Sequence, residues 1–122
     1  MKVKITERGW PGHFICGDRC LFRRNTLIEI GQSKIVVSTV GNLRIDYKTD
    51  TIGAGGRYYE TMAFKAKKEG DYWEADVAEN ISFNSEWAIC AEASDRLPKD
   101  VDNIADQMHE EVIKEIIASF TN

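Results

Sequence analysis

The sequence predicts an α+β domain in which an antiparallel β-meander precedes one long C-terminal amphipathic helix. Up to about residue 93, short runs of alternating polar and apolar residues are separated by turn residues; from residue 98, apolar residues recur every three or four positions. The 122 residues fit a single domain, with a β-rich part over 1–93 and a helix over 98–120.

The first third of the chain predicts a strand, a turn and a hairpin. Residues 2–8, KVKITER, alternate as a strand with one solvated face does. Residues 9–12 have the composition of a turn, and residues 13–16 are a short strand candidate. Residues 21–40 predict a hairpin with Gly31 near its tip.

The middle of the chain adds further strands on either side of a loop. Residues 33–41, SKIVVSTVG, are rich in β-branched side chains, which favours a central strand. Residues 46–56 end in several glycines and predict a loop. Strands are predicted again at 57–67, where polar and apolar residues alternate, and at 72–77 and 86–91.

Helical spacing is continuous from Val101. Apolar residues then recur at positions 104, 105, 108, 112, 113, 116, 117 and 120. The arc between Ile104 and Ile117 spans about 220° on a helical wheel. Because one sheet face would cover about half of that arc, we expect this helix to meet a second helix in a homodimer or larger homo-oligomer.

The composition excludes several classes of partner. With 16 basic and 20 acidic residues the net charge is −4, so no DNA or RNA partner is expected. No apolar run has the length of a membrane span and no secretory start is present, so we expect a cytoplasmic protein without a membrane partner. The odd number of cysteines, Cys16, Cys20 and Cys90, indicates thiols in a reducing compartment.

Four polar residues interrupt the first arm of the predicted hairpin. They are Arg23, Arg24, Asn25 and Thr26. Because successive side chains in a strand point to opposite faces, the first and third project on one side and the second and fourth on the other. Guanidinium groups suit phosphate, and amide and hydroxyl groups add neutral donors. The alternative is a set of surface residues paired with acidic side chains of the sheet.

A second candidate is the stretch GAGGRYY, residues 53–59. Glycines let backbone N–H groups approach a ligand, and an arginine with tyrosines can hold a phosphate and stack on a base. The predicted ligand-binding residues here are Gly55, Gly56, Arg57 and Tyr58. The stretch is not a P-loop, and the alternative is a plain hairpin loop.

His109 is the third candidate, because it lies inside the apolar arc of the predicted helix. Its two interpretations are a hydrogen-bonded core or interface residue and a ligand contact at a dimer seam.

Metal binding and catalysis have little support in the sequence. The spacing of His13, Cys16 and Cys20 superficially resembles a zinc motif, which Cys90 or His109 would complete, but it lacks Cys-x2-Cys pairs. A Cys–His nucleophile pair is the other alternative. No serine stands in a nucleophile elbow, and we expect no catalytic residue, no metal and no cofactor.

Three runs, ITERGWPGHFICGDRCLFRRNT, GGRYYETMAF and QMHEEVIKEI, resemble a family of small phage and prophage proteins, the first Thoeris anti-defence family. The resemblance covers nearly the whole chain. It implies a dimeric sponge that catalyses nothing and sequesters cyclic ADP-ribose isomers made by bacterial TIR-domain proteins, with cyclic oligonucleotides as a further ligand class for some members.

The resemblance also implies roles for the candidate residues in an infected or lysogenic bacterial cell. The phosphates would contact Arg23, Arg24, Gly55, Gly56 and Arg57, and the base or ribose would contact His109. The family pattern calls for basic residues on the C-terminal helix, where this chain offers only His109 and Lys114.

Three other function classes stay open. An anti-CRISPR-like inhibitor of a host defence protein would present a flat acidic face, whereas the acids here are spread through the sequence. A nucleotide-handling enzyme would turn its ligand over, and a structural phage component would bind no small molecule.

Overall fold

The computed structural model describes residues 2–13, 17–45, 48–52, 57–81, 88–90 and 101–121. The elements in these ranges are β1 (Val3–Glu7), the 3-10 helix η1 (Gly17–Arg19), β2 (Cys20–Ile30), β3 (Ser33–Ile45), β4 (Lys48–Asp50), β5 (Arg57–Glu69), β6 (Tyr72–Ile81), β7 (Ala88–Cys90) and α1 (Val101–Thr121).

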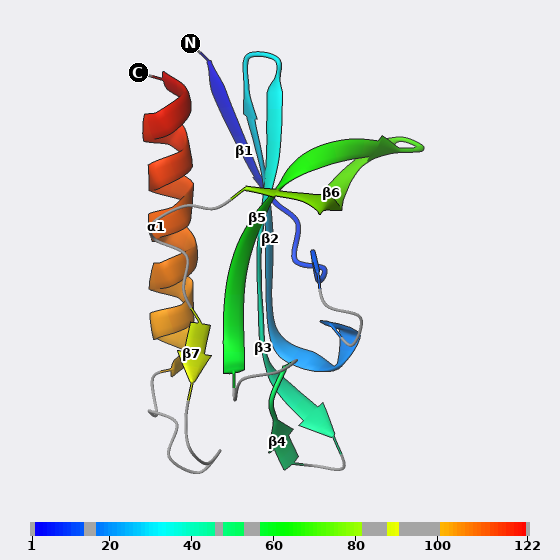
Figure 1. Ribbon diagram of the computed structural model, residues 1–122, viewed down its shortest axis with the longest axis vertical. Helices are drawn as coiled ribbons and strands as arrows, with labels where there is room; N and C mark the ends of the chain where they lie inside the picture. Colours follow the sequence, from blue (N-terminus) through cyan, green and yellow to red (C-terminus); the bar gives the residue numbers. More distant parts are fainter. Residues whose placement is uncertain are drawn as a thin grey trace.

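The strands form one antiparallel sheet with α1 along one side (Figure 1). Its order is β1-β2-β3-β5-β6, with β4 paired to β3 and β7 paired to β5. Neighbours in the chain are therefore neighbours in the main part of the sheet, as in a meander. The predicted α+β class, with a β-meander followed by a long helix, is confirmed.

The hairpin of β2 and β3 turns at Gly31, whose φ of 58° is accessible to glycine without strain. Two predictions about strands are wrong. Residues 46–56 include a short strand, because β4 folds back on the end of β3, and His13 lies outside any strand. Residues 14–16 of that strand candidate, and residues 98–100 of the predicted helix, lie outside the described residues.

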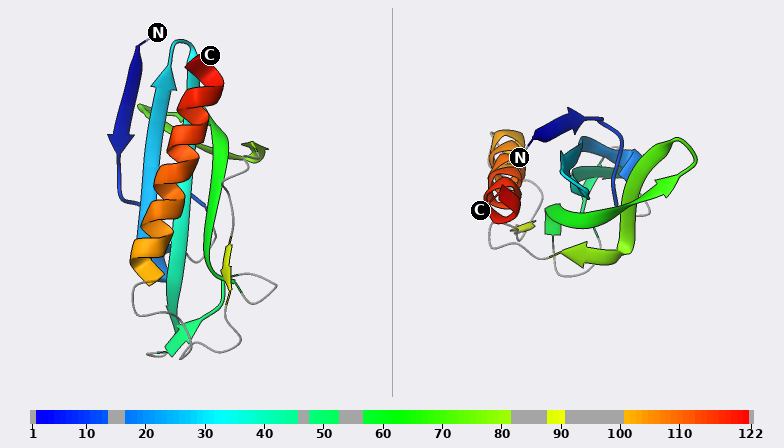
Figure 2. Two further views of the ribbon diagram at one scale, coloured as in Figure 1. Left: turned by 90° about the vertical axis from the view of Figure 1, so that its left-hand side faces the viewer. Right: turned by 90° about the horizontal axis from the view of Figure 1, so that it is seen from above.

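α1 runs along one face of the sheet (Figure 2). An apolar cluster of buried side chains joins the helix to the sheet. Each of the three central strands contributes a fully buried side chain to it: Ile28 on β2, Val37 on β3 and Ala63 on β5. They pack against Val112 and Ile116 of α1. The apolar residues that alternate along the strands and those that recur every 3.6 residues along the helix therefore form one core.

The apolar arc of α1 is covered largely by the chain's own sheet. Its centre is buried from Val101 to Ile116, and its edges, Ile104 and Ile117, are partly buried against the same clusters. The width of the arc therefore does not itself require a second helix, and the homo-oligomer stays a prediction. α1 is also not apolar enough over its length to span a membrane.

Gly12 and His13, which follow β1, pack on the other face of the sheet. The ring centroid of His13 lies 5.7 Å from that of Phe64 on β5. Gly12 lies so close to β3 that a Cβ atom there would be 2.6 Å from the Cβ of Ser38. Only glycine permits this approach without movement of the strand or of the residues that follow β1.

Candidate ligand-binding site

The predicted site residue His109 lies in the interface between α1 and the sheet, with 0% of its surface exposed. Its Nε2 is 2.7 Å from Oγ1 of Thr26, and its Nδ1 is 2.7 Å from Oγ1 of Thr39. Thr39 in turn lies 2.7 Å from Oγ1 of Thr61 on β5. Both ring nitrogens are therefore satisfied inside the domain, which agrees with the core interpretation of this histidine.

The hydrogen bond from Thr26 to Glu7 determines which groups donate and which accept in this chain of hydrogen bonds. Thr26 Oγ1 lies 3.2 Å from both carboxylate oxygens of Glu7, and an ionised carboxylate can only accept. Because a hydroxyl has one hydrogen, His109 must donate from Nε2 to Thr26 and accept at Nδ1 from Thr39. Burial lowers the pKa of His109 to about 3, so the neutral tautomer persists at physiological pH.

Arg24 is held between β1 and α1 by three carboxylates. Its Nε donates to Glu7 at 2.6 Å, and its Nη1 lies 2.8 Å from Asp106 and 3.4 Å from Glu110. This guanidinium also disfavours protonation of His109. Its donors are directed at acids of the same chain, so it fits a structural clamp better than a phosphate site.

Arg23 and Asn25 lie on the opposite face from Arg24, as strand alternation predicts. Arg23 is exposed, whereas Asn25 is fully buried and its Oδ1 accepts hydrogen bonds from Arg8 Nε at 3.0 Å and Nη2 at 2.7 Å. The backbone N–H of Arg8 also donates to the carbonyl of Asn25 at 2.8 Å. Asn25 thus binds Arg8, the first residue after β1, to β2.

The second predicted group is only partly described. Arg57 is exposed and its Nη1 lies 3.0 Å from Oε1 of Glu60. Tyr58 is buried in the cluster beneath the first turns of α1. Gly55 and Gly56 lie outside the described residues.

The predicted ligand-binding residues therefore do not meet in one pocket within the described ranges. The structure brings Arg24, Thr26 and His109 together, and partners from the same chain already engage their polar groups. Their roles in ligand binding stay predictions.

A serine–histidine–glutamate series on the other face was not predicted. His13 Nδ1 is 2.7 Å from Ser38 Oγ, and its Nε2 is 3.5 Å from Glu60 Oε2. The neighbouring imidazole, with a further contribution from Arg57, lowers the pKa of Glu60. Ser38, however, has 0% of its surface exposed, so its hydroxyl is not accessible to a substrate.

The zinc alternative gains no support from the described residues. Cys20 is buried in an apolar cluster with Val40 and Leu43. Cys16 and the side chain of Cys90 are not described, and no group of three or more potential ligands gathers within the described ranges.

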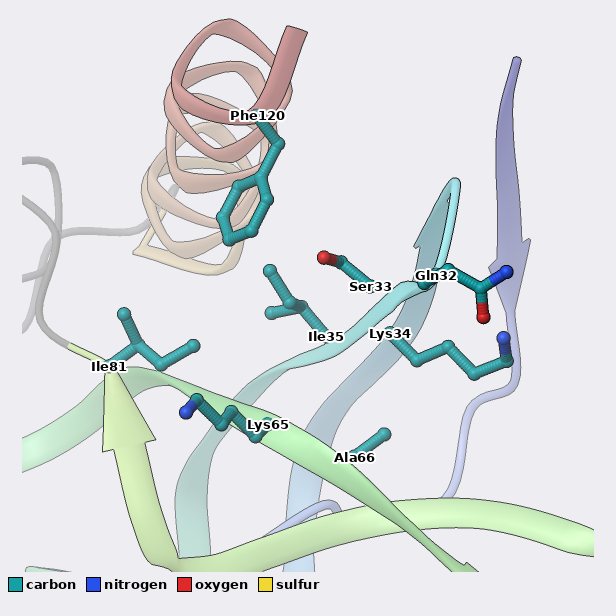
Figure 3. A pocket seen from close by; sticks show the side chains of 8 residues that line it. All are labelled: Gln32, Ser33, Lys34, Ile35, Lys65, Ala66, Ile81 and Phe120. Carbon is teal, nitrogen blue, oxygen red and sulfur yellow. The ribbon is translucent and has the colours of Figure 1, made fainter. Parts of the chain in front are cut away.

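A pocket of about 240 Å³ opens beside the tip of the β2–β3 hairpin (Figure 3). We call it the hairpin-tip pocket. It is formed where the hairpin, β5, the end of β6 and the last turn of α1 come together. Its polar lining consists of Gln32, Ser33, Lys34 and Lys65, and its apolar lining of Ile35, Ala66, Ile81 and Phe120.

This lining combines cationic donors with an aromatic wall. In Figure 3 the Ser33 hydroxyl is directed toward the Phe120 side of the pocket, and the Lys65 ammonium lies toward Ile81. The Lys34 ammonium lies 5.0 Å from the ring centre of Trp73. Among the described residues that line the pocket, none is acidic. Such a lining suits an anion that also carries a flat ring, because ammonium and hydroxyl groups bind phosphate and an aromatic wall can stack on a base.

The sequence carries a weak signal for this pocket. Lys65 occupies the same strand face as the buried Ala63 and Thr61, where the alternation would favour a less polar residue. Phe120 marks the last apolar position of the helix. Nothing in the sequence places Lys65 beside Ile35, because the register of β3 and β5 decides this pairing.

Comparison of the chain with protein-family models, with curated proteins and with solved structures finds no match.

Proposed function

We propose that this protein is a phage anti-defence protein that binds a cyclic nucleotide immune signal and sequesters it without cleavage. The signal is a cyclic ADP-ribose isomer, with cyclic oligonucleotides as a further ligand class. The observation that supports small-anion binding is the hairpin-tip pocket, with its two lysines, a serine and a phenylalanine. The identity of the signal rests on the resemblance of the sequence to the Thoeris anti-defence family.

The pocket supplies the contacts that retention of such a signal requires. Lys65 and Ser33 offer charge-assisted and neutral hydrogen bonds to a phosphate, and Phe120 offers a ring face to a base. The net charge of −4 opposes the approach of an anion only weakly, because charges are screened beyond about 8 Å at physiological salt. Slow release then depends on these local contacts.

The same pocket offers little for hydrolysis. Neither a carboxylate nor an imidazole is among its described lining residues, and both histidines are engaged elsewhere, His13 with Ser38 and His109 with the threonines. Retention without turnover is therefore the activity that this lining supports best.

We expect Lys65→Met to weaken binding of a cyclic ADP-ribose isomer about tenfold, because one charge-assisted hydrogen bond is lost. Titration calorimetry measures the change. Lys67→Met is the matched control, because this exposed lysine is on the same strand but does not line the pocket. Its Nζ lies 3.3 Å from Oε1 of Glu69. Equal affinities of the two variants, with unchanged circular dichroism, would remove Lys65 from the site.

A second candidate function is inhibition of a host defence protein through α1. Contrary to the expectation that the acids are spread, four exposed acids gather on this helix: Asp102, Asp106, Glu110 and Glu111. Two of them are already committed to Arg24, which weakens their attraction for a partner. Binding of a defence protein by a preparation that retains no nucleotide would favour this candidate.

A further inference from the structure

A second depression lies on the other side of the hairpin tip. It has a volume of about 310 Å³ and is lined by Lys2, Lys4, Glu29 and Gly31. We call it the β1 depression. Gly31 belongs to the same turn as Gln32, which lines the hairpin-tip pocket, so consecutive residues of one turn border the two cavities.

Strand register aligns the basic residues of the two cavities. Lys4 on β1 is the partner of Glu29 on β2, and Glu29 is the partner of Lys34 on β3. The three side chains therefore stand in one row on one face of the sheet. Since neighbouring strands are about 4.8 Å apart, the two lysines emerge roughly 10 Å from each other, with a carboxylate between them.

Lys34 extends away from the centre of the hairpin-tip pocket. In Figure 3 its ammonium and that of Lys65 point in opposite directions, and the Gln32 amide lies on the Lys34 side. The two ammonium groups are thus not converged on one phosphate. Lys34 therefore extends away from Phe120 and belongs to the row of Lys4 and Glu29, while Lys65 lies toward Ile81.

The volume of the hairpin-tip pocket is an independent reason to expect that the ligand extends beyond it. Pockets that bury most of a drug-sized ligand measure roughly 300–1,000 Å³, and the hairpin-tip pocket, at about 240 Å³, is smaller. It can enclose one base or one nucleoside, but not a molecule of two nucleotide units. The remainder of such a ligand would have to lie across the turn.

We infer that the two cavities form one bipartite site astride the β2–β3 turn, for a ligand whose two phosphoryl groups are separated by a nucleoside, as in a cyclic dinucleotide. Lys65 and Ser33 hold one group, and Lys2 and Lys4 hold the other. Glu29 stands between the cations and opposes the placement of both negative charges at the middle of the row. This inference rests on the proposed function and specifies how its cyclic oligonucleotide ligands are held.

The test compares probes with one and with two phosphoryl groups. Adenosine monophosphate, a cyclic ADP-ribose isomer and cyclic di-adenosine monophosphate are titrated into the wild type and into Lys2→Met/Lys4→Met. We expect the double variant to bind cyclic di-adenosine monophosphate about tenfold more weakly. Binding of adenosine monophosphate and of the cyclic ADP-ribose isomer, whose two phosphoryl groups are directly linked, should be unchanged. Lys67→Met/Lys68→Met removes the same charge outside both cavities and serves as the control.

The possible results separate this inference from the proposed function. If Lys65→Met weakens binding of cyclic di-adenosine monophosphate and Lys2→Met/Lys4→Met does not, the site has one lobe and the bipartite inference is wrong, while ligand binding stands. An equal loss in the control variant would assign the effect to net charge and would also overturn the inference. If the wild type binds none of the probes, both proposals fall.

Discussion

Replacement of His109 by alanine is expected to lower the free energy of unfolding by about 3–5 kcal/mol at pH 7. The change opens a cavity at a fully buried position and deprives the hydroxyl groups of Thr26 and Thr39 of their 2.7 Å partners. Denaturant titration measures the loss. Gln107→Ala, on the exposed side of the same helix, should change stability by less than about 0.5 kcal/mol.

The same variant should also alter the dependence of stability on pH. The pKa of His109 is about 3 in the folded state, against about 6.5 in the unfolded chain, so the unfolded chain binds the extra proton between these values. The stabilisation by neutral His109 is therefore complete above about pH 6.5 and declines as the pH falls. Between pH 7 and pH 5 the wild type should lose about 2 kcal/mol that His109→Ala does not lose.

Comparing the wild type with His109→Ala isolates the contribution of His109 to the pH dependence, because the carboxylates of the domain titrate in both proteins. A difference between wild type and variant that stays constant from pH 7 to pH 5 would show that His109 is not held neutral in the fold. A difference below about 1 kcal/mol at pH 7 would show that the buried hydrogen-bond chain contributes little.

Gly41→Ala is expected to lower the free energy of unfolding by about 2–4 kcal/mol, because β3 has no room for a side chain at this position. A Cβ atom there would lie 2.1 Å from Cδ2 and 2.4 Å from Cγ of Tyr59, its partner on β5. Tyr59 cannot move aside easily, since it is fully buried and its hydroxyl donates to Asp102 of α1.

Gly70→Ala provides the comparison for this variant. Gly70 has a φ of 61°, and a Cβ atom added there would meet no atom within 4 Å, so alanine should cost only about 1–2 kcal/mol of backbone strain. Thermal and chemical denaturation of both variants measures the difference. If Gly70→Ala were the more damaging change, steric contact with Tyr59 would not be the reason for glycine at position 41.

Local patterns were sufficient to predict much of the fold. The β2–β3 hairpin follows from Gly31 between two alternating runs, and α1 follows from the spacing of apolar residues after Val101. The short β4 was missed, because three residues in a glycine-rich region carry too little periodicity to distinguish a strand from a loop.

The site was harder to predict, because its geometry depends on residues far apart in the chain. Alternation predicted that Arg23 and Arg24 lie on opposite faces of the strand. It could not show that Arg24 pairs with Asp106 of α1, which lies 82 positions away in the sequence. The hairpin-tip pocket likewise needs Lys65 and Phe120 to meet beside Ser33. Only the register of the sheet and the position of the helix bring such residues together.

The most direct test of the proposed sequestration is one incubation of the pure protein with TIR-derived cyclic ADP-ribose isomers and cyclic di- and trinucleotides. After filtration, free ligand is quantified, and the protein is then heated and the released ligand analysed. The proposed function predicts that a ligand disappears from the filtrate and returns intact on heating. A ligand that returns altered would indicate an enzyme, and one that never leaves the filtrate would contradict sequestration and favour a protein partner.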